Sequence, residues 1–120
     1  MKRLILTATL VACAAFAGQA LAAGNAAAGQ KIVANKCAAC HGKDGNSTSP
    51  QFPRLAGQYA DYIEHALHAY QSGARKNAIM NGMAAGLSDQ QIKDVAAWFS
   101  SQTGLSTVEY KTWDANHGGR

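Results

Sequence analysis

The sequence predicts a small all-α domain of three to four helices, and three observations support this fold class. Apolar residues recur at three- and four-residue steps in segments that begin with helix-capping residues. No segment of useful length alternates polar and apolar residues, as a half-buried strand would. Glycines and prolines gather between the periodic segments, where they indicate loops. The 120 residues are enough for one domain and too few for two.

Residues 1–22 have the pattern of a cleaved secretory signal peptide. Lys2 and Arg3 give a positive start, Leu4 to Phe16 is almost wholly apolar, and Ala20-Leu21-Ala22 has the spacing of a cleavage site. The apolar run is too short for a retained membrane span. We therefore expect a mature domain over residues 23–104 and a C-terminal extension over residues 105–120. One alternative is a lipoprotein box at Leu10-Val11-Ala12-Cys13, which would leave the protein anchored through Cys13.

The charge balance does not indicate nucleic-acid binding. The chain has 11 basic and 7 acidic residues, and its formal charge of +4 falls to +2 when Lys2 and Arg3 leave with the signal peptide. The remaining positive charges are scattered, and only Arg75 and Lys76 are adjacent. A nucleic-acid partner is therefore not expected, because such partners need a basic patch or stripe. No later stretch is apolar enough to cross a bilayer, so no integral membrane span is expected either.

Three helices are predicted along the mature chain. Residues 25–36 are alanine-rich, with Asn25 as an N-cap and with Gly29 placed to allow close approach of another helix. Residues 58–72 carry one apolar stripe and end at Gly73. That stripe consists of Tyr59, Tyr62, Ile63, Ala66, Leu67 and Tyr70. The last helix opens with a capping box of Ser88 and Gln91 and stops at Gly104. Its buried stripe is Ile92, Val95, Ala96 and Phe99.

The segments between these helices are predicted to be irregular. Residues 42–57 form a loop rich in turn residues, and residues 75–86 carry glycines and two methionines without a clear period. His65 and His68 are three residues apart on the second helix, but they fall on its polar face with Asp61 and Glu64. We interpret both histidines as solvated rather than as metal ligands.

The sequence Cys37-Ala-Ala-Cys40-His41 is the attachment motif of c-type haem. Two residues between the cysteines let both sulfurs reach vinyl groups along one side of a porphyrin, and the adjacent histidine can then ligate the iron. A covalently held haem would also supply core to a small domain with long loops. The alternatives are a thiol–disulfide site, which normally follows a strand, and a zinc site, for which no module spacing is present.

Several motifs around these cysteines resemble class I cytochromes c, with the bacterial c-four and c-five-like group as the most similar type. They are Ala26-Ala-Ala-Gly-Gln30, the extended haem motif from Cys37 to Asn46, Phe52-Pro-Arg-Leu-Ala-Gly-Gln58, and Leu87-Ser-Asp89 before a Trp-Phe helix. The resemblance covers roughly residues 24–103. It implies a small class I cytochrome c fold, with the helices wrapped around one covalently bound haem c.

The resemblance also implies a ligand set. His41 and a methionine in the segment before the last helix would be the axial iron ligands, with Met80 on the family position and Met83 as the competitor. The carbonyl of Pro53, or of Pro50 as the alternative, would orient His41. Leu55, Tyr59, Ile63 and Leu67 would line the haem pocket. Gly29 would meet Trp98 or Phe99 where the first and last helices cross.

The expected function is transfer of single electrons between redox proteins of a respiratory chain, in the periplasm and without catalysis of its own. A His/Met pair raises the reduction potential and leaves the iron no open position. The alternatives are a haem enzyme with a weak or absent sixth ligand, and a fixed subunit docked to a membrane oxidase or dehydrogenase complex. Lys36, Lys43 and Arg54 are candidates for a charged ring that contacts transient redox partners.

Overall fold

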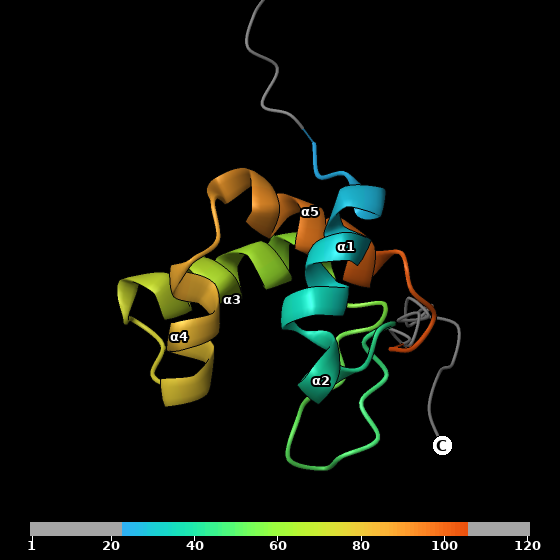
Figure 1. The fold of residues 1–120 in the computed structure, drawn as a ribbon, viewed down its shortest axis with the longest axis horizontal. Coiled ribbons are helices and arrows are strands. Elements are labelled where there is room, and N and C mark those ends of the chain that lie inside the picture. Colours follow the sequence, from blue (N-terminus) through green and yellow to red (C-terminus); the bar gives the residue numbers. More distant parts are fainter. Residues whose placement is uncertain (1–22, 106–120) are drawn as a thin grey trace, which may run out of the picture.

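The computed structural model describes residues 23–105 as a bundle of short helices with long connections (Figure 1). The elements are α1 (Ala26–Lys36), α2 (Ala38–His41), α3 (Ala60–Ser72), α4 (Ala78–Ala85) and α5 (Asp89–Ser100). No strand occurs within these residues, so the predicted all-α class is confirmed. The expected signal peptide and nearly all of the expected C-terminal extension lie outside the described residues.

The first and last helices cross at Gly29, as expected. A Cβ atom at Gly29 would meet the backbone carbonyl of Asp94 on α5 and would lie 3.0 Å from the Cβ atom of Trp98. The buried carboxylate of Asp94 accepts hydrogen bonds from the backbone N–H of Asn25 (2.8 Å) and from the Gln90 side chain (2.9 Å). Asp94 therefore fixes the start of α1 on α5 through its side chain while its backbone carbonyl lies against Gly29.

The hydrophobic core lies between α1, α3 and α5. The largest fully buried side chains are Phe99, Ile92, Val33 and Val95. Ile63 and Leu67 of α3 complete the central cluster together with Ala84, Leu87 and Ala96. All four residues of the predicted stripe on α5 are buried. The helix predicted over residues 58–72 begins at Ala60, so Tyr59 of its stripe is the N-cap. Tyr59 and Tyr62 are 61% and 48% exposed. Fewer residues of α3 are therefore buried than its apolar stripe predicts, and its buried residues are Ile63 and Leu67.

The predicted helix boundaries are set by local hydrogen bonds. Asn25 accepts from the backbone N–H of Ala28, and Ser88 and Gln91 form both bonds of a capping box. Gly73 ends α3 in the left-handed conformation (φ +76°), which glycine adopts without strain. The last helix ends at Ser100 rather than at Gly104, because the N–H of Ser101 already caps its final carbonyls.

The prediction that residues 75–86 are irregular is wrong, because most of this segment forms α4. Asn77 caps this helix by accepting a hydrogen bond from the backbone N–H of Met80 (3.0 Å). The side chain of Gln71 on α3 donates to the carbonyls of Ala84 (2.9 Å) and Leu87 (2.7 Å) at the other end. Gly82 lies inside α4 in open space, so the helix is held by bonds to its neighbours rather than by its own propensity.

Among residues 23–105, no helix is both long enough and apolar enough to cross a membrane.

Candidate haem site

One turn of backbone carries the two cysteines and His41. Cys37 ends α1, and its carbonyl accepts hydrogen bonds from the N–H groups of Cys40 (3.2 Å) and His41 (3.0 Å). Cys37 is the N-cap of α2, and Cys40 and His41 are its last two residues, so all three come from one helical turn. Both cysteines are half-buried and free of disulfide bonds, and His41 is buried.

The environment of Cys37 does not suit thiol–disulfide exchange. Burial raises the pKa of the Cys37 thiol to about 11, while the neighbouring Lys36 ammonium acts in the opposite direction. An attacking cysteine needs a lowered pKa and an accessible thiolate, and Cys37 has the reverse. The zinc alternative also lacks support: within residues 23–105, no group of three or more His, Cys, Asp or Glu side chains is placed to hold a metal ion.

The imidazole of His41 is oriented by the loop that follows it. Its Nδ1 atom lies 2.9 Å from the carbonyl oxygen of Pro53 and donates a hydrogen bond to it. Pro53 rather than Pro50 therefore supplies this contact. The ring of Phe52 packs edge-on against the imidazole, with 6.3 Å between ring centroids and 67° between ring planes. With Nδ1 occupied in this way, Nε2 is the nitrogen left to ligate a metal.

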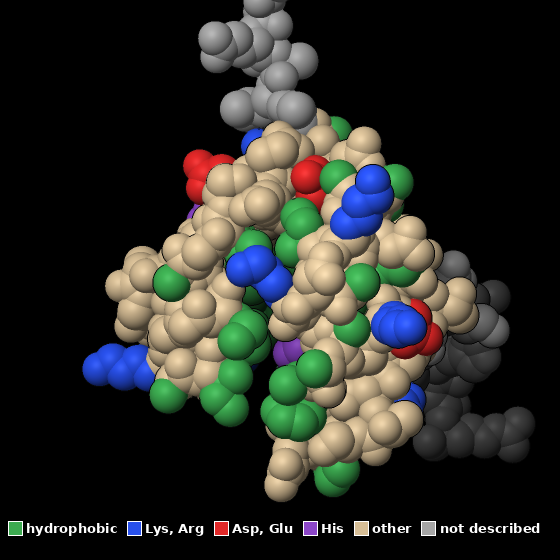
Figure 2. Space-filling model, in the orientation of Figure 1, with side chains coloured by type: hydrophobic (Ala, Val, Ile, Leu, Met, Phe, Trp, Pro, Cys, Tyr) green, Lys and Arg blue, Asp and Glu red, His purple; other side chains and the backbone are tan. Residues whose placement is uncertain are grey.

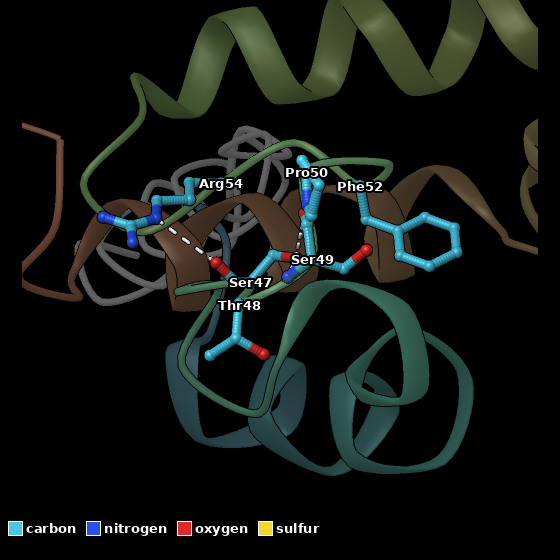
Figure 3. Close-up of a pocket in the computed structure, with 6 residues that line it drawn as sticks. All are labelled: Ser47, Thr48, Ser49, Pro50, Phe52 and Arg54. Atoms are coloured by element: carbon cyan, nitrogen blue, oxygen red, sulfur yellow. Dashed lines mark hydrogen bonds between the residues drawn. The ribbon is translucent and has the colours of Figure 1, made fainter.

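The loop that carries Pro53 is fixed by its own hydrogen bonds (Figure 3). The side chain of Arg54 donates through Nε to the carbonyl of Ser47 (3.2 Å), and the Ser47 hydroxyl donates to the carbonyl of Ser49 (3.1 Å). At the base of the loop, Gly45 has φ +80° and accepts from the N–H of Leu55 (2.8 Å). These bonds hold the Pro53 carbonyl in place and thereby the plane of the imidazole.

A hollow with apolar walls separates α4 from α2. Figure 2 shows hydrophobic side chains on both walls and a histidine side chain between them, and Figure 1 places α4 and α2 on opposite sides of this hollow. Leu55, Cys37, Ala38 and Met80 are half-buried and pack against the central core. Paired thiols, an oriented imidazole and apolar walls are the donors and surroundings that a covalent haem requires.

The two methionines of α4 differ in burial. Met80 is half-buried and packs against the core, on the same face as the fully buried Ala84. Met83 is 46% exposed, and Ile79, one turn before it, is 57% exposed. Of the two methionines, only Met80 therefore packs against the core.

Other predicted site residues lie at the start of α3. The exposed side chains of Tyr59 and Tyr62 line an open cavity of about 680 Å³ with Asp61 and His65. His65 and His68 are both exposed, as expected from their place on the polar face. The place of Tyr59 in a haem pocket stays a prediction. Ile63 and Leu67 are buried in the central core.

Sequence reasoning missed three side chains that shape the site. In the sequence Phe52 stands out only as part of a motif, although its ring packs against His41. Gln71 and Asn81 were not singled out, although both hold α4 in place. The available signal was the spacing Asn77-x-x-Met80-Asn81, which combines an N-cap with a second asparagine four residues later.

This combination of helical fold and Cys-x-x-Cys-His turn defines a class I c-type cytochrome. The cytochrome c family model matches residues 26–103, and the chain belongs to that family. Within it, the chain belongs to the c4 group, and its cofactor is covalently bound haem c. Cys37 and Cys40 fit the attachment motif of that cofactor.

Individual relatives support the same assignment. Cytochrome c-554(548) of Halomonas halodenitrificans is 49% identical over 83 residues, which cover 67% of this chain and 99% of the relative. Cytochrome c4 of Pseudomonas aeruginosa is 51% identical over 85 residues, 71% of this chain and 42% of the relative. The reduced cytochrome c4 structure from Pseudomonas stutzeri has a TM-score of 0.64 at 48% identity and covers 69% of this chain and 48% of that one. The chain thus spans about half the length of its c4 relatives.

Proposed function

We propose that this protein is a periplasmic carrier that shuttles single electrons between redox proteins of a respiratory chain, with His41 and Met80 as the axial ligands of its haem iron. The observation that carries the proposal is the position of α4. This helix presents the half-buried Met80 on its inner face, and it forms the wall of the hollow opposite α2, which carries His41. Membership of the cytochrome c family supports the same chemistry.

The proposed residues have two roles, which are attachment of the haem and ligation of its iron. Cys37 and Cys40 hold the haem through thioether bonds, and Pro53 keeps Nδ1 of His41 protonated so that Nε2 can bind iron. The bound haem supplies a reversible one-electron change at its iron. A soft thioether ligand from Met80 favours the reduced state and raises the reduction potential. Ligation of the iron by both His41 and Met80 would leave no position open for a substrate, which favours electron transfer over catalysis.

Named relatives support redox proteins as partners. The thiosulfate dehydrogenase electron acceptor of Stutzerimonas stutzeri is 46% identical over 81 residues, 60% of this chain and 38% of the relative. The cytochrome subunit of sulfide dehydrogenase from Chlorobaculum tepidum is 37% identical over 71 residues. We propose a dehydrogenase as donor for this chain too. The second relative favours the alternative of a fixed subunit in such a complex. The signal-like pattern of residues 1–22 supports the periplasm as location.

The ligand set is tested by optical spectra of the purified holoprotein in both oxidation states. We expect the weak far-red band of a methionine–ferric bond, and no spectral response of the reduced protein to carbon monoxide. Met80→Ala is expected to lose the far-red band and to bind carbon monoxide. Met83→Ala removes the more exposed methionine of the same helix, and this matched control is expected to keep the wild-type spectra.

The outcomes separate the alternatives. If Met83→Ala loses the band and Met80→Ala keeps it, the assignment of the sixth ligand is wrong. If the wild-type protein binds carbon monoxide readily, the iron has an open position and the catalytic alternative gains support. Co-purification of a stoichiometric partner protein with the untagged cytochrome would favour the fixed-subunit alternative over a diffusing carrier.

A further inference from the structure

We propose that Asn81 and Gln71 are positioning residues that fix α4 at its two ends and thereby hold the Met80 thioether at the iron. The inference rests on the proposed ligation by Met80. Helix α4 is short and buries only one residue fully, so it needs further contacts to keep the Met80 side chain in place. Neither residue is required by the motif that binds the haem.

Asn81 connects three segments of chain with one side-chain amide. Its Nδ2 donates to the carbonyl of Tyr70 in the last turn of α3 (2.6 Å) and to the carbonyl of Arg75 in the following turn (2.9 Å). Its Oδ1 accepts from the backbone N–H of Asn77 (2.8 Å). Both donors and the acceptor of the amide are therefore used, and the start of α4 is tied to the end of α3.

The Asn81 network reaches the backbone of Met80 directly. Asn77, whose N–H is held by Asn81, accepts through its own Oδ1 from the N–H of Met80 (3.0 Å). Met80 is therefore one hydrogen bond away from the residue that Asn81 holds. A shift of Asn77 moves the N–H partner of Met80, so loosening Asn81 also loosens the backbone that carries the thioether.

Gln71 fixes the opposite end of the same helix. Its Nε2 donates to the carbonyls of Ala84 (2.9 Å) and Leu87 (2.7 Å), which lie at the end of α4 and in the link to α5. The helix is eight residues long and has Gly82 in its interior, so its own backbone bonds hold it weakly. Only Ala84 of α4 is fully buried, so side-chain hydrogen bonds supply much of what keeps this helix on α3.

The consequence is a specific effect on ligand exchange. A ligand from outside can bind the iron only after the Met80 thioether leaves, so its apparent affinity reports how well Met80 is held. Removing hydrogen bonds that hold only the segment that carries Met80 favours the state in which the thioether has left the iron. Loss of the Asn81 bonds is expected to raise the affinity of such a ligand about tenfold, the size of effect expected for well-formed hydrogen bonds.

The experiment is an imidazole titration of the ferric holoprotein, followed by the loss of the far-red band. We expect Asn81→Ala to bind imidazole about tenfold more tightly than wild type and its reduced form to bind carbon monoxide measurably. Gln71→Ala is expected to show a change in the same direction, and it serves as the second variant if Asn81→Ala does not assemble. Both variants are expected to keep the far-red band when no imidazole is present.

Two controls separate positioning from a general loss of stability. Asn35→Ala removes an exposed asparagine amide that donates to the carbonyl of Lys31 within α1 (2.9 Å), and Ser88→Ala removes the N-cap of α5. Both are expected to keep wild-type imidazole affinity, although Ser88→Ala lowers stability. Wild-type imidazole affinity in Asn81→Ala and Gln71→Ala, or an equal gain of affinity in Ser88→Ala, would overturn the positioning role but not the ligation by Met80. Absence of the far-red band from the wild-type protein would overturn both the Met80 ligation and the inference.

Discussion

Gly29 on α1 lies directly against the backbone carbonyl of Asp94 on α5. A side chain at this position would overlap with backbone atoms that cannot rotate away, so the two helices can cross here only because residue 29 has no Cβ atom. The same crossing brings α1 close to Trp98, whose indole N–H donates to the carbonyl of Lys43 just after the haem motif (2.8 Å). The helix pair thus also supports the turn that carries the cysteines.

Gly29→Ala is therefore expected to destabilise the holoprotein by ~1–3 kcal/mol, because α1 and α5 must move apart. Helix propensity acts in the opposite direction and favours alanine by only about 1 kcal/mol. Gly82→Ala is the matched control, since a Cβ atom at Gly82 on α4 would meet nothing within 4 Å. We expect it to stabilise the protein by up to ~1 kcal/mol. Guanidinium unfolding of both variants measures their free energies of unfolding. Changes of the same sign in the two variants would contradict the prediction.

A second prediction concerns the stability of the protein at low pH. The carboxylate of Asp44 accepts hydrogen bonds from the side chain (2.9 Å) and the backbone N–H (3.0 Å) of Asn46, which lower its pKa below the ordinary value of 3.8. A lowered pKa means that the carboxylate contributes stability above pH 3.8, and that this contribution is lost as the pH falls through the folded-state pKa. Asn46 also donates to the carbonyl of Thr103, so the turn is tied to the chain after α5.

Asp44→Ala is accordingly expected to melt below wild type at neutral pH, with a difference that narrows once the pH drops below 3.8. Thermal melts of the two holoproteins across this range measure the difference directly, because the other titrating groups are common to both. A difference that stays constant down to the lowest pH would show that the carboxylate charge does not matter at this turn.

The parts of the fold that the sequence predicts are those with local signals. The capping box of Ser88 and Gln91 and the four-residue stripe predict α5, and Asn25 predicts the start of α1. The turn of cysteines and His41 follows from its spacing alone. In each case, the residues that decide the structure lie within one or two turns of one another.

The parts that the sequence does not predict depend on distant contacts. Helix α4 contains Gly82 and has no regular stripe, and it is held by Asn81 and Gln71 through bonds to segments that the sequence does not pair. The choice between Pro53 and Pro50 likewise depends on how the loop folds back to His41. Spacing alone could not separate Met80 from Met83, because residues three apart lie on roughly the same side of a helix. The difference depends on packing, since Met80 packs against the core and Met83 is exposed.

The hydrogen bond between His41 and Pro53 leads to a prediction for the reduction potential. If His41 ligates the iron as proposed, donation from Nδ1 to the Pro53 carbonyl would make the imidazole a stronger electron donor and would favour the ferric state. Pro53→Ala loosens this loop, and weakening the bond is expected to raise the potential by up to ~40 mV, which corresponds to ~1 kcal/mol for one electron. Protein-film voltammetry measures the shift, and Pro50→Ala is the control. A lower potential in Pro53→Ala would contradict this role.

The last prediction concerns the charge at the edge of the hollow. Lys36, Lys43 and Arg54 are exposed, and the Lys36 ammonium lies beside Gly86 after α4, so it extends from the end of α1 toward the opposite wall. Figure 2 shows a basic side chain above the hollow. Such a charge would attract anionic reagents to the haem edge and repel cationic ones. Its effect on reaction rates would decline as salt shortens the Debye length from ~10 Å at 0.1 M to ~3 Å at 1 M.

We expect Lys36→Gln to slow oxidation of the reduced protein by hexacyanoferrate(III) several-fold at low ionic strength and to speed its oxidation by a cationic cobalt complex. At 1 M salt, both rates are expected to approach wild type, because screening removes the field but leaves the haem environment intact. Lys31→Gln is the matched control, since this exposed lysine lies on the same helix more than a turn from the haem motif. Stopped-flow rates decide the matter. A change of the same sign with both oxidants would indicate an altered reduction potential rather than a steering charge. Equal effects of the two lysine variants would indicate that the net charge of the protein, and not the position of Lys36, sets the rates.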